Sequence, residues 1–231
     1  MPWLIARYLP VGLFSLKHGE ATSTGGKSLL IPTPFAIRTA LLDAAIRVEG
    51  RKNGEKAFAH LKAVQIALRP PRYAAISGLF GKILKPERKK EVDRAMTPTI
   101  AFREYVHLWD ELTLAFGGDT TDLDALARWL PHLTYLGKRG SFIQLVEPPR
   151  QENELPPQFI SLKYGGPSNA FPMGVIQRVD EWGPELTFEK VNTFSEEKIS
   201  LNKDRVRMDV IIPYRMSRAG RSFTLYERLF P

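Results

Sequence analysis

The sequence predicts an α+β protein with a larger N-terminal part and a smaller, β-rich C-terminal part. Three observations support this prediction. Apolar residues recur at helical spacing in two segments of the first 146 residues, and runs typical of strands surround them. After residue 158, glycine and proline separate only short strand-like runs. A chain of 231 residues is long enough to bury a sizeable core.

The first strand is expected over Leu4–Phe14, and a polar loop rich in glycine, serine and threonine follows it. A helix then begins at Thr33 and Pro34, because threonine is a good N-cap and the first helical turn tolerates proline. Its inward face is marked by apolar residues at helical spacing, namely Ile37, Leu41, Ala44 and Val48. A strand that leads into a helix through a loop rich in N–H donors is a plausible anion site.

The same loop contains a relaxed phosphate-loop pattern over Ala21–Ser28. In a true phosphate loop the lysine and serine begin a helix that cradles a nucleotide phosphate. Pro32 and Pro34 lie where the interior of that helix would have to be, and proline there removes a donor and clashes with the preceding turn. The helix is therefore expected too far from Lys27 for a nucleotide cradle, which makes a P-loop-like nucleotide hydrolase the less favoured alternative.

Four further elements complete the first part, and a short second helical piece over Glu55–Lys62 precedes them. They are strands over Ala63–Leu68, Thr99–Leu108 and Ser141–Val146, and a helix over Asp122–Leu130. The order strand, helix, strand, strand, helix, strand is that of a ferredoxin-like (RRM-like) βαββαβ fold. Its four-stranded sheet is a common RNA-binding platform.

A long insertion over residues 70–98 separates the second predicted strand from the third. It holds apolar residues that must bury against something, and long insertions in compact domains are usually functional or disordered. Its basic cluster is Lys85, Arg88, Lys89 and Lys90.

The second part follows a polar, proline-rich linker over residues 147–158. Residues 159–231 form the β-rich C-terminal region of this prediction. Strands are expected over residues 174–179, 186–190, 205–212 and 222–229, and a hairpin loop over residues 215–220.

Positive charge is concentrated in the first hundred residues. These hold 17 lysine and arginine residues against 7 aspartate and glutamate residues (net +10), whereas the rest of the chain carries −2, for a total of +8. A basic half joined to a near-neutral half favours a polyanion as one partner and proteins as others. The chain has no cysteine and no apolar run that could span a membrane, so a cytoplasmic protein is expected.

Catalytic chemistry is sparse in the sequence. The four histidines, at positions 18, 60, 107 and 132, lie at no metal-ligand spacing, so neither a metal nor another cofactor is predicted. His18, beside Lys17 in the basic loop, is the one histidine suited to acid–base work. Basic residues near the ends of predicted elements, with an aromatic among them, instead suit phosphates and unstacked bases. The candidate RNA-binding residues are Lys17, His18, Lys27, Arg38, Arg69, Arg72, Tyr73, Lys138 and Arg139.

Over about residues 1–146, the chain resembles CRISPR-associated proteins of the RAMP superfamily. It is most similar to the subunit that caps the 5′ handle of the guide RNA in type I (Cascade) effector complexes. The resemblance rests on four short motifs. They are Phe14-Ser15 at the end of the first strand, the loop running into Ile31-Pro-Thr-Pro34 before Ala40-Leu-Leu-Asp-Ala-Ala45, Phe102-Arg-Glu-Tyr105, and Tyr135-Leu-Gly-Lys-Arg-Gly140.

The resemblance implies a ferredoxin-like palm that holds the crRNA handle and a thumb, here residues 70–98, that packs at the junction of handle and spacer. It implies a role in antiviral defence within a ribonucleoprotein complex. The partners would be the guide RNA, the repeating backbone subunit, the large subunit and target DNA. Most members are not catalytic. Some cleave precursor crRNA with a tyrosine, a lysine and a histidine, which keeps a metal-independent endoribonuclease using His18 as the alternative.

Overall fold

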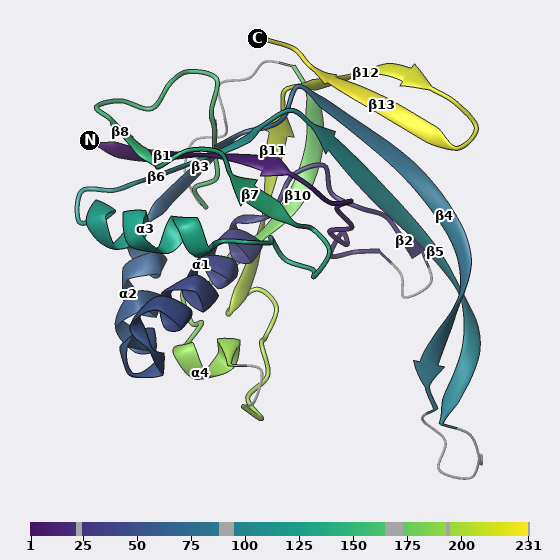
Figure 1. The fold of residues 1–231 in the computed structure, drawn as a ribbon. Helices are drawn as coiled ribbons and strands as arrows, with labels where there is room; N and C mark the ends of the chain where they lie inside the picture. The colour runs from purple at the N-terminus through teal and green to yellow at the C-terminus, as the bar shows by residue number, and fades with distance from the viewer. Residues whose placement is uncertain (22–24, 88–94, 165–172, 193–194, 231) are drawn as a thin grey trace.

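The protein is a mixed α/β structure rich in strands, which confirms the predicted fold class at this level (Figure 1). The computed structural model describes residues 1–21, 25–87, 95–164, 173–192 and 195–230. Part of the predicted basic cluster, Arg88 to Lys90, lies outside these residues. None of the helices in the described ranges is long and apolar enough to cross a membrane.

The central sheet has the strand order β7-β1-β6-β3-β9, with β8 also paired to β1. Every pairing in it is antiparallel. Its strands are β1 (Trp3–Pro10), β3 (Gln65–Arg69), β6 (Leu112–Gly117), β7 (Ile143–Leu145), β8 (Arg150–Glu152) and β9 (Ile160–Ser161). Two of these strands, β8 and β9, lie in or after the predicted linker yet complete a sheet of the first part. The proposed division of the chain at residues 146–159 stays a prediction.

Three helices pack on one face of this sheet, α1 (Pro34–Glu49), α2 (Gly54–Ala63) and α3 (Leu123–Trp129). Side chains alternate along β1, so Leu4, Ala6 and Tyr8 point into the core beneath the helices. The predicted helix start is confirmed, because the Thr33 side chain accepts a hydrogen bond from the Ala36 backbone N–H at 3.1 Å. The helix therefore does not begin at Lys27, as a nucleotide-binding phosphate loop would require.

A second sheet, of order β12-β13-β4-β5-β2, carries a long hairpin away from the body (Figure 1). Its two arms are β4 (Tyr73–Pro86) and β5 (Met96–Trp109), and the sheet also contains β2 (Gly25–Gly26), β12 (Tyr214–Ala219) and β13 (Phe223–Arg228). The predicted loop insertion is thus largely β-structure.

The strand predicted over Thr99–Leu108 exists, but the sheet assigned to it was wrong. The predicted third strand of the palm, Thr99–Leu108, belongs to β5 of the second sheet, and β6 takes its place in the central sheet. The pattern explains the difference: β6 is buried at every position, as a central strand covered on both faces requires, whereas much of β5 is exposed.

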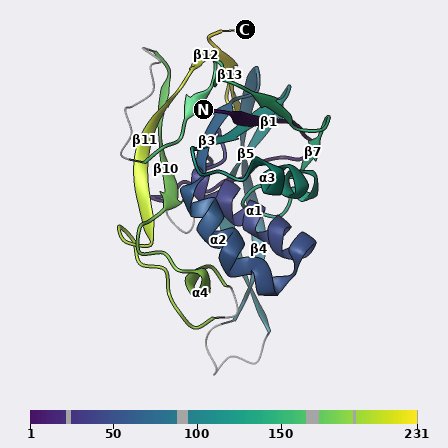
Figure 2. The ribbon, with the colours of Figure 1, turned by 90° about the vertical axis from the view of Figure 1, so that its left-hand side faces the viewer.

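A third element, the hairpin of β10 (Val175–Trp182) and β11 (Arg205–Ile212), stands beside the helices (Figure 2). The strand predicted over residues 186–190 is wrong, because the short helix α4 (Phe188–Val191) forms there behind the N-cap Thr187. The hairpin loop predicted over residues 215–220 is also wrong, because most of it forms β12, which pairs with β13.

Candidate nucleic-acid interface

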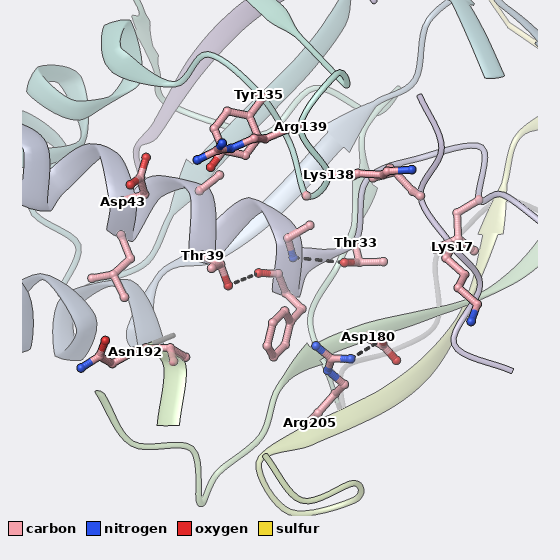
Figure 3. Close-up of a pocket in the computed structure, with 18 of the residues that line it drawn as sticks. Lys17, Thr33, Thr39, Asp43, Tyr135, Lys138, Arg139, Asp180, Asn192 and Arg205 are labelled. Carbon is pink, nitrogen blue, oxygen red and sulfur yellow. Dashed lines mark hydrogen bonds and ion pairs between the residues drawn. The ribbon is translucent and has the colours of Figure 1, made fainter. Parts of the chain in front are cut away.

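A groove of about 900 Å³ runs along the outer face of α1 (Figure 3). Opposite sides of it are formed by the turn around Lys138 and by the β10–β11 hairpin with α4. Apolar side chains cover much of its floor, among them Leu16, Leu29, Phe35, Ala40, Ile46 and Val191. Its charged lining residues are Lys17, Asp43, Arg51, Lys138, Arg139, Asp180 and Arg205.

Local sequence rules create this groove. Helix α1 buries Ile37 and Leu41 on its inward face. Its outer face also carries apolar side chains, Phe35 and Ile46, and these line the groove. At the opposite wall, Gly137 has a φ of 73°, and a Cβ there would lie 2.9 Å from the Leu16 side chain. Glycine therefore allows the Lys138 turn to close tightly over the first loop.

The charges of the groove are not balanced. Asp43 is paired with Arg47 at 3.0 Å, and Asp180 lies 3.7 Å from Arg205 and 3.4 Å from Arg207. In contrast, four exposed cations form no ion pair with any carboxylate among the described residues. These are Lys17, Arg51, Lys138 and Arg139. The groove therefore presents positive charge above an apolar floor, an arrangement that suits phosphates and bases together.

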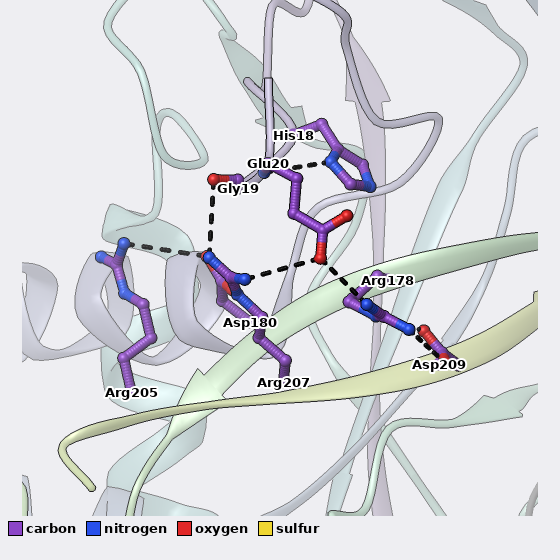
Figure 4. Close-up of polar contacts among 8 residues, drawn as sticks. All are labelled: His18, Gly19, Glu20, Arg178, Asp180, Arg205, Arg207 and Asp209. Carbon is purple, nitrogen blue, oxygen red and sulfur yellow. Dashed lines mark hydrogen bonds and ion pairs between the residues drawn. The ribbon is translucent and has the colours of Figure 1, made fainter. Parts of the chain in front are cut away.

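The loop that carries Lys17 is tied to the β10–β11 hairpin by charged side chains (Figure 4). Glu20 accepts a hydrogen bond from Arg178 at 2.9 Å and lies 3.6 Å from Arg207. Arg178 also binds Asp209 through two contacts of 2.8 and 3.1 Å. Arg178, and then Arg207, lower the pKa of Glu20. The contacts attach a loop from the first part of the chain to a hairpin from the last.

The predicted site residues of this loop fall in two places. Lys17 lines the groove, whereas His18 and Lys27 sit in the same loop but do not. The His18 backbone N–H donates to the Lys27 carbonyl at 3.0 Å, and the His18 Nδ1 accepts from the Glu20 N–H at 3.2 Å. No group of three or more histidine, aspartate or glutamate side chains in the described residues is arranged to hold a metal ion.

Arg38 does not fit the predicted phosphate-binding role. Its side chain is buried, and Nε and Nη2 donate to the two carboxylate oxygens of Glu181 at 2.8 and 2.9 Å. Its Nη1 donates to the carbonyls of Leu61 and Val64. The prediction is corrected because a guanidinium occupied on all sides within the core cannot reach a ligand.

Arg69, Arg72 and Tyr73 lie away from the groove, at the corner where β3 leads into β4. Arg69 stands opposite Thr113 on the sheet face that the helices do not cover, since the helix-facing residues of β3 are Ile66 and Leu68. The structure thus brings Lys17, Lys138 and Arg139 of the nine candidates together and leaves Arg69, Arg72 and Tyr73 at a separate place.

Sequence reasoning missed Arg51, Arg205 and Tyr135, all of which line the groove. Arg205 lies 4.2 Å above the Phe35 ring, and nothing in the sequence links residues 170 positions apart. Arg51 offered a signal: it follows the α1 helix directly after the C-cap Gly50, and the outer apolar residues of that helix indicate a second contact surface.

Comparison with known proteins finds one informative relative. The chain is 26% identical over 219 residues to the CRISPR-associated protein Cas5 of Archaeoglobus fulgidus, covering 90% of this chain and 95% of the relative. No protein-family model matches. A crystal structure of a CRISPR protein from Archaeoglobus fulgidus aligns over 99% of this chain and 92% of its own, with 12% identity and a TM-score of 0.44, too low to carry an argument. The predicted resemblance to CRISPR-associated proteins is confirmed by the sequence relative.

Replacing Arg38 with alanine should destabilise the protein by about 3–5 kcal/mol, because it leaves the Glu181 carboxylate buried without its partner. The double variant Arg38→Met/Glu181→Leu should lose clearly less, since no charge remains buried. Denaturant unfolding measures both. The control is Arg215→Ala, which removes one partner of the exposed Arg215–Glu227 ion pair. This change should lower the free energy of unfolding by no more than about 1 kcal/mol. Equal stability of Arg38→Ala and the control would contradict this role.

Replacing Glu20 with glutamine should loosen the Lys17 loop without changing global stability. Limited trypsin digestion should cut after Lys17 and Lys27 about two- to fivefold faster, because exposed ion pairs contribute modestly. Glu227→Gln is the matched control in another hairpin. Because the folded-state pKa of Glu20 is lowered, the attachment is present above its ordinary pKa and is lost as the pH falls through the lowered value. An unchanged cleavage rate would show that the network does not hold the loop.

Proposed function

Because the chain is a homologue of a CRISPR-associated protein, we propose that it is a crRNA-binding subunit of a type I (Cascade) surveillance complex in antiviral defence. In this proposal it caps the 5′ handle of the guide RNA and does not cut RNA. The groove beside α1 holds part of the handle.

The observation that carries the proposal is the set of unpaired cations around the groove. Lys17, Lys138 and Arg139 come from two loops that are 121 positions apart, yet they line one surface. Phosphates of a single strand would meet these cations, and unstacked bases would meet the apolar floor and the Tyr135 ring. The α1 helix beneath these cations is a fixed surface, which suits recognition of the RNA by its backbone and its shape.

The strand order of the central sheet supports the finer fold assignment. The four strands β7, β1, β6 and β3 are neighbours in this order in the sheet. Along the chain, α1 lies between β1 and β3, and α3 lies between β6 and β7. We assign this unit as the ferredoxin-like palm. Antiparallel β6 lies between β1 and β3, as a split βαβ unit requires.

The long β4–β5 hairpin has the properties expected of the thumb. Its described residues expose large apolar side chains, with Leu79, Phe80 and Leu84 at 57%, 64% and 66% exposure. Such a surface is costly unless another molecule covers it. We propose that the complex covers it at the junction of handle and spacer, where the backbone subunit and the large subunit are the expected neighbours and target DNA a further contact.

Lys138→Ala/Arg139→Ala should weaken binding to a repeat-derived single-stranded RNA and flatten its salt dependence. Each phosphate contact contributes a slope of about 0.7 on the log–log plot, so the slope should fall by about 1.4. Fluorescence anisotropy across a salt series measures this, with scrambled RNA and matched DNA beside the repeat RNA. The control Lys56→Ala/Lys163→Ala removes two exposed lysines that do not line the groove.

Equal affinity of the chain for all three nucleic acids would contradict the proposal, as would a loss of slope in the control variant alone.

The chain should leave repeat RNA intact, because His18 lies outside the groove that would hold the substrate. Incubation with precursor RNA in the absence of metal ions, analysed on a denaturing gel, tests this. His18→Ala should retain an affinity within about threefold of the unmodified chain, since one partly exposed side chain away from the strand contributes little. Cleavage that disappears in His18→Ala would instead establish the endoribonuclease alternative.

A further inference from the structure

An exposed tryptophan, Trp109, ends β5 at the root of the long hairpin and does not line the groove. Trp109 is 67% exposed, whereas Trp3, Trp129 and Trp182 are 6% exposed or less. It is the cross-strand partner of Tyr73, and the two ring centroids lie 6.2 Å apart. An indole ring this open offers a face on which a nucleic-acid base can stack.

One arginine contacts this aromatic pair, and two more lie at the same corner of the fold. The Arg72 guanidinium lies 5.1 Å above the Tyr73 ring. Arg228 donates to the Pro70 and Phe230 carbonyls at 2.6 and 2.9 Å, which fixes it beside the turn before β4. Arg69 ends β3 directly before the same turn. In the part of the chain that the structure describes, no carboxylate pairs with any of the three.

Two carboxylates near this corner already have other arginine partners. Glu227, the cross-strand partner of Tyr73, is paired with Arg215 at 3.1 Å. Glu111 is held by Arg7 through contacts of 2.7 and 2.6 Å, so its charge is already matched. Asp110 remains as one negative charge against three positive ones. Burial lowers the pKa of Arg228, and the neighbouring Arg69 and Arg72 lower it further, while Asp110 opposes them. The corner is therefore electropositive and lacks an anion.

Two buried polar atoms at the same corner have no partner among the described residues. They are Nε of Arg69 and Oγ1 of Thr113, which stand opposite one another on β3 and β6. Thr113 is only 2% exposed. Buried polar groups are almost always hydrogen-bonded, so these two atoms leave hydrogen-bonding capacity unused at this corner.

We propose that this corner, formed by Arg69, Arg72, Tyr73 and Trp109 beside the buried Arg228, is a second contact site for single-stranded nucleic acid. A base stacks on the open face of Trp109, and the adjoining phosphodiester accepts hydrogen bonds from the arginines. None of these residues lines the α1 groove, so the site is separate from it. This second-site proposal rests on the proposed function only in its choice of RNA as the nucleic acid.

A protein partner is the less favoured occupant. Tryptophan, tyrosine and arginine are also the residues that dominate protein interfaces. The exposed Arg72 guanidinium and the Arg69 Nε, which has no partner among the described residues, however, favour acceptors at close spacing, which a phosphodiester chain supplies along its whole length.

Acrylamide quenching of tryptophan fluorescence tests the site in the full chain, because Trp109 alone among the four tryptophans is open to the quencher. Saturating single-stranded oligouridylate should protect the quenchable component, and Trp109→Leu should abolish that component. Affinity should fall at least about fivefold in Trp109→Leu and stay within about threefold in Trp109→Phe, since phenylalanine retains a stacking face. Arg72→Gln should lower the salt slope by about 0.7.

The matched control is Tyr164→Leu, an aromatic residue 52% exposed beyond the other end of β3, which should leave affinity unchanged. In Lys138→Ala/Arg139→Ala, RNA should still protect Trp109 from the quencher, although a higher RNA concentration is needed. This result would show that RNA binds the corner independently of the groove. Undiminished quenching at saturating RNA, together with unchanged affinity of Trp109→Leu, would overturn the proposal even if the groove binds RNA. Protection by a partner subunit in the absence of RNA, with none by RNA, would overturn it in favour of a protein interface.

Discussion

The buried ion pair between Arg38 and Glu181 is the interaction on which the groove depends. It joins α1, which forms the floor, to β10, which forms one wall, and the same guanidinium also binds the carbonyls of Leu61 and Val64 at the end of α2. Two charges are costly to bury, and this geometry satisfies both carboxylate oxygens and three guanidinium nitrogens. The pair fixes an orientation that apolar packing alone leaves less defined.

The charges that face the ligand lie around this ion pair, on a turn and on a loop. Lys138 and Arg139 belong to a tight turn, and Lys17 belongs to a loop held by exposed ion pairs to Arg178 and Arg207. Exposed ion pairs hold a loop only weakly, so the Lys17 loop is attached to the β10–β11 hairpin less firmly than α1 is. A firmly held α1 helix beneath a weakly attached Lys17 loop suits a ligand that is recognised by its shape and its phosphate spacing.

Local rules predicted the parts of the structure that local forces determine. The start of α1 at Thr33 and Pro34 followed from capping preferences, and helical spacing predicted the burial of Ile37, Leu41 and Ala44. Val48, predicted on the same inward face, is 38% exposed because it lies in the last turn of the helix. The strand assigned to the palm over Thr99–Leu108 was wrong because alternation marks a strand but does not say which sheet it joins. Only pairing over long sequence distance decides that β6 is central.

The same limit applies to the candidate site. Lys17, Lys138 and Arg139 were chosen as basic residues near element ends, and the fold brings them to one groove. Arg38 looked equivalent in the sequence, but its partner Glu181 is 143 positions away. Arg205 and Trp109 were missed for the converse reason, because exposure and convergence are properties of the folded chain and no local pattern marks them.

The most direct test of the central claim is to map where the RNA lies. A repeat-derived RNA carrying 4-thiouridine, bound to the full chain and cross-linked with near-ultraviolet light, should give cross-linked peptides that contain Tyr135 and residues of the Lys17 loop. Mass spectrometry identifies them, and excess unlabelled repeat RNA should suppress them. Cross-links confined to surfaces outside the α1 groove and the β3–β4 corner, at saturating RNA, would contradict the account.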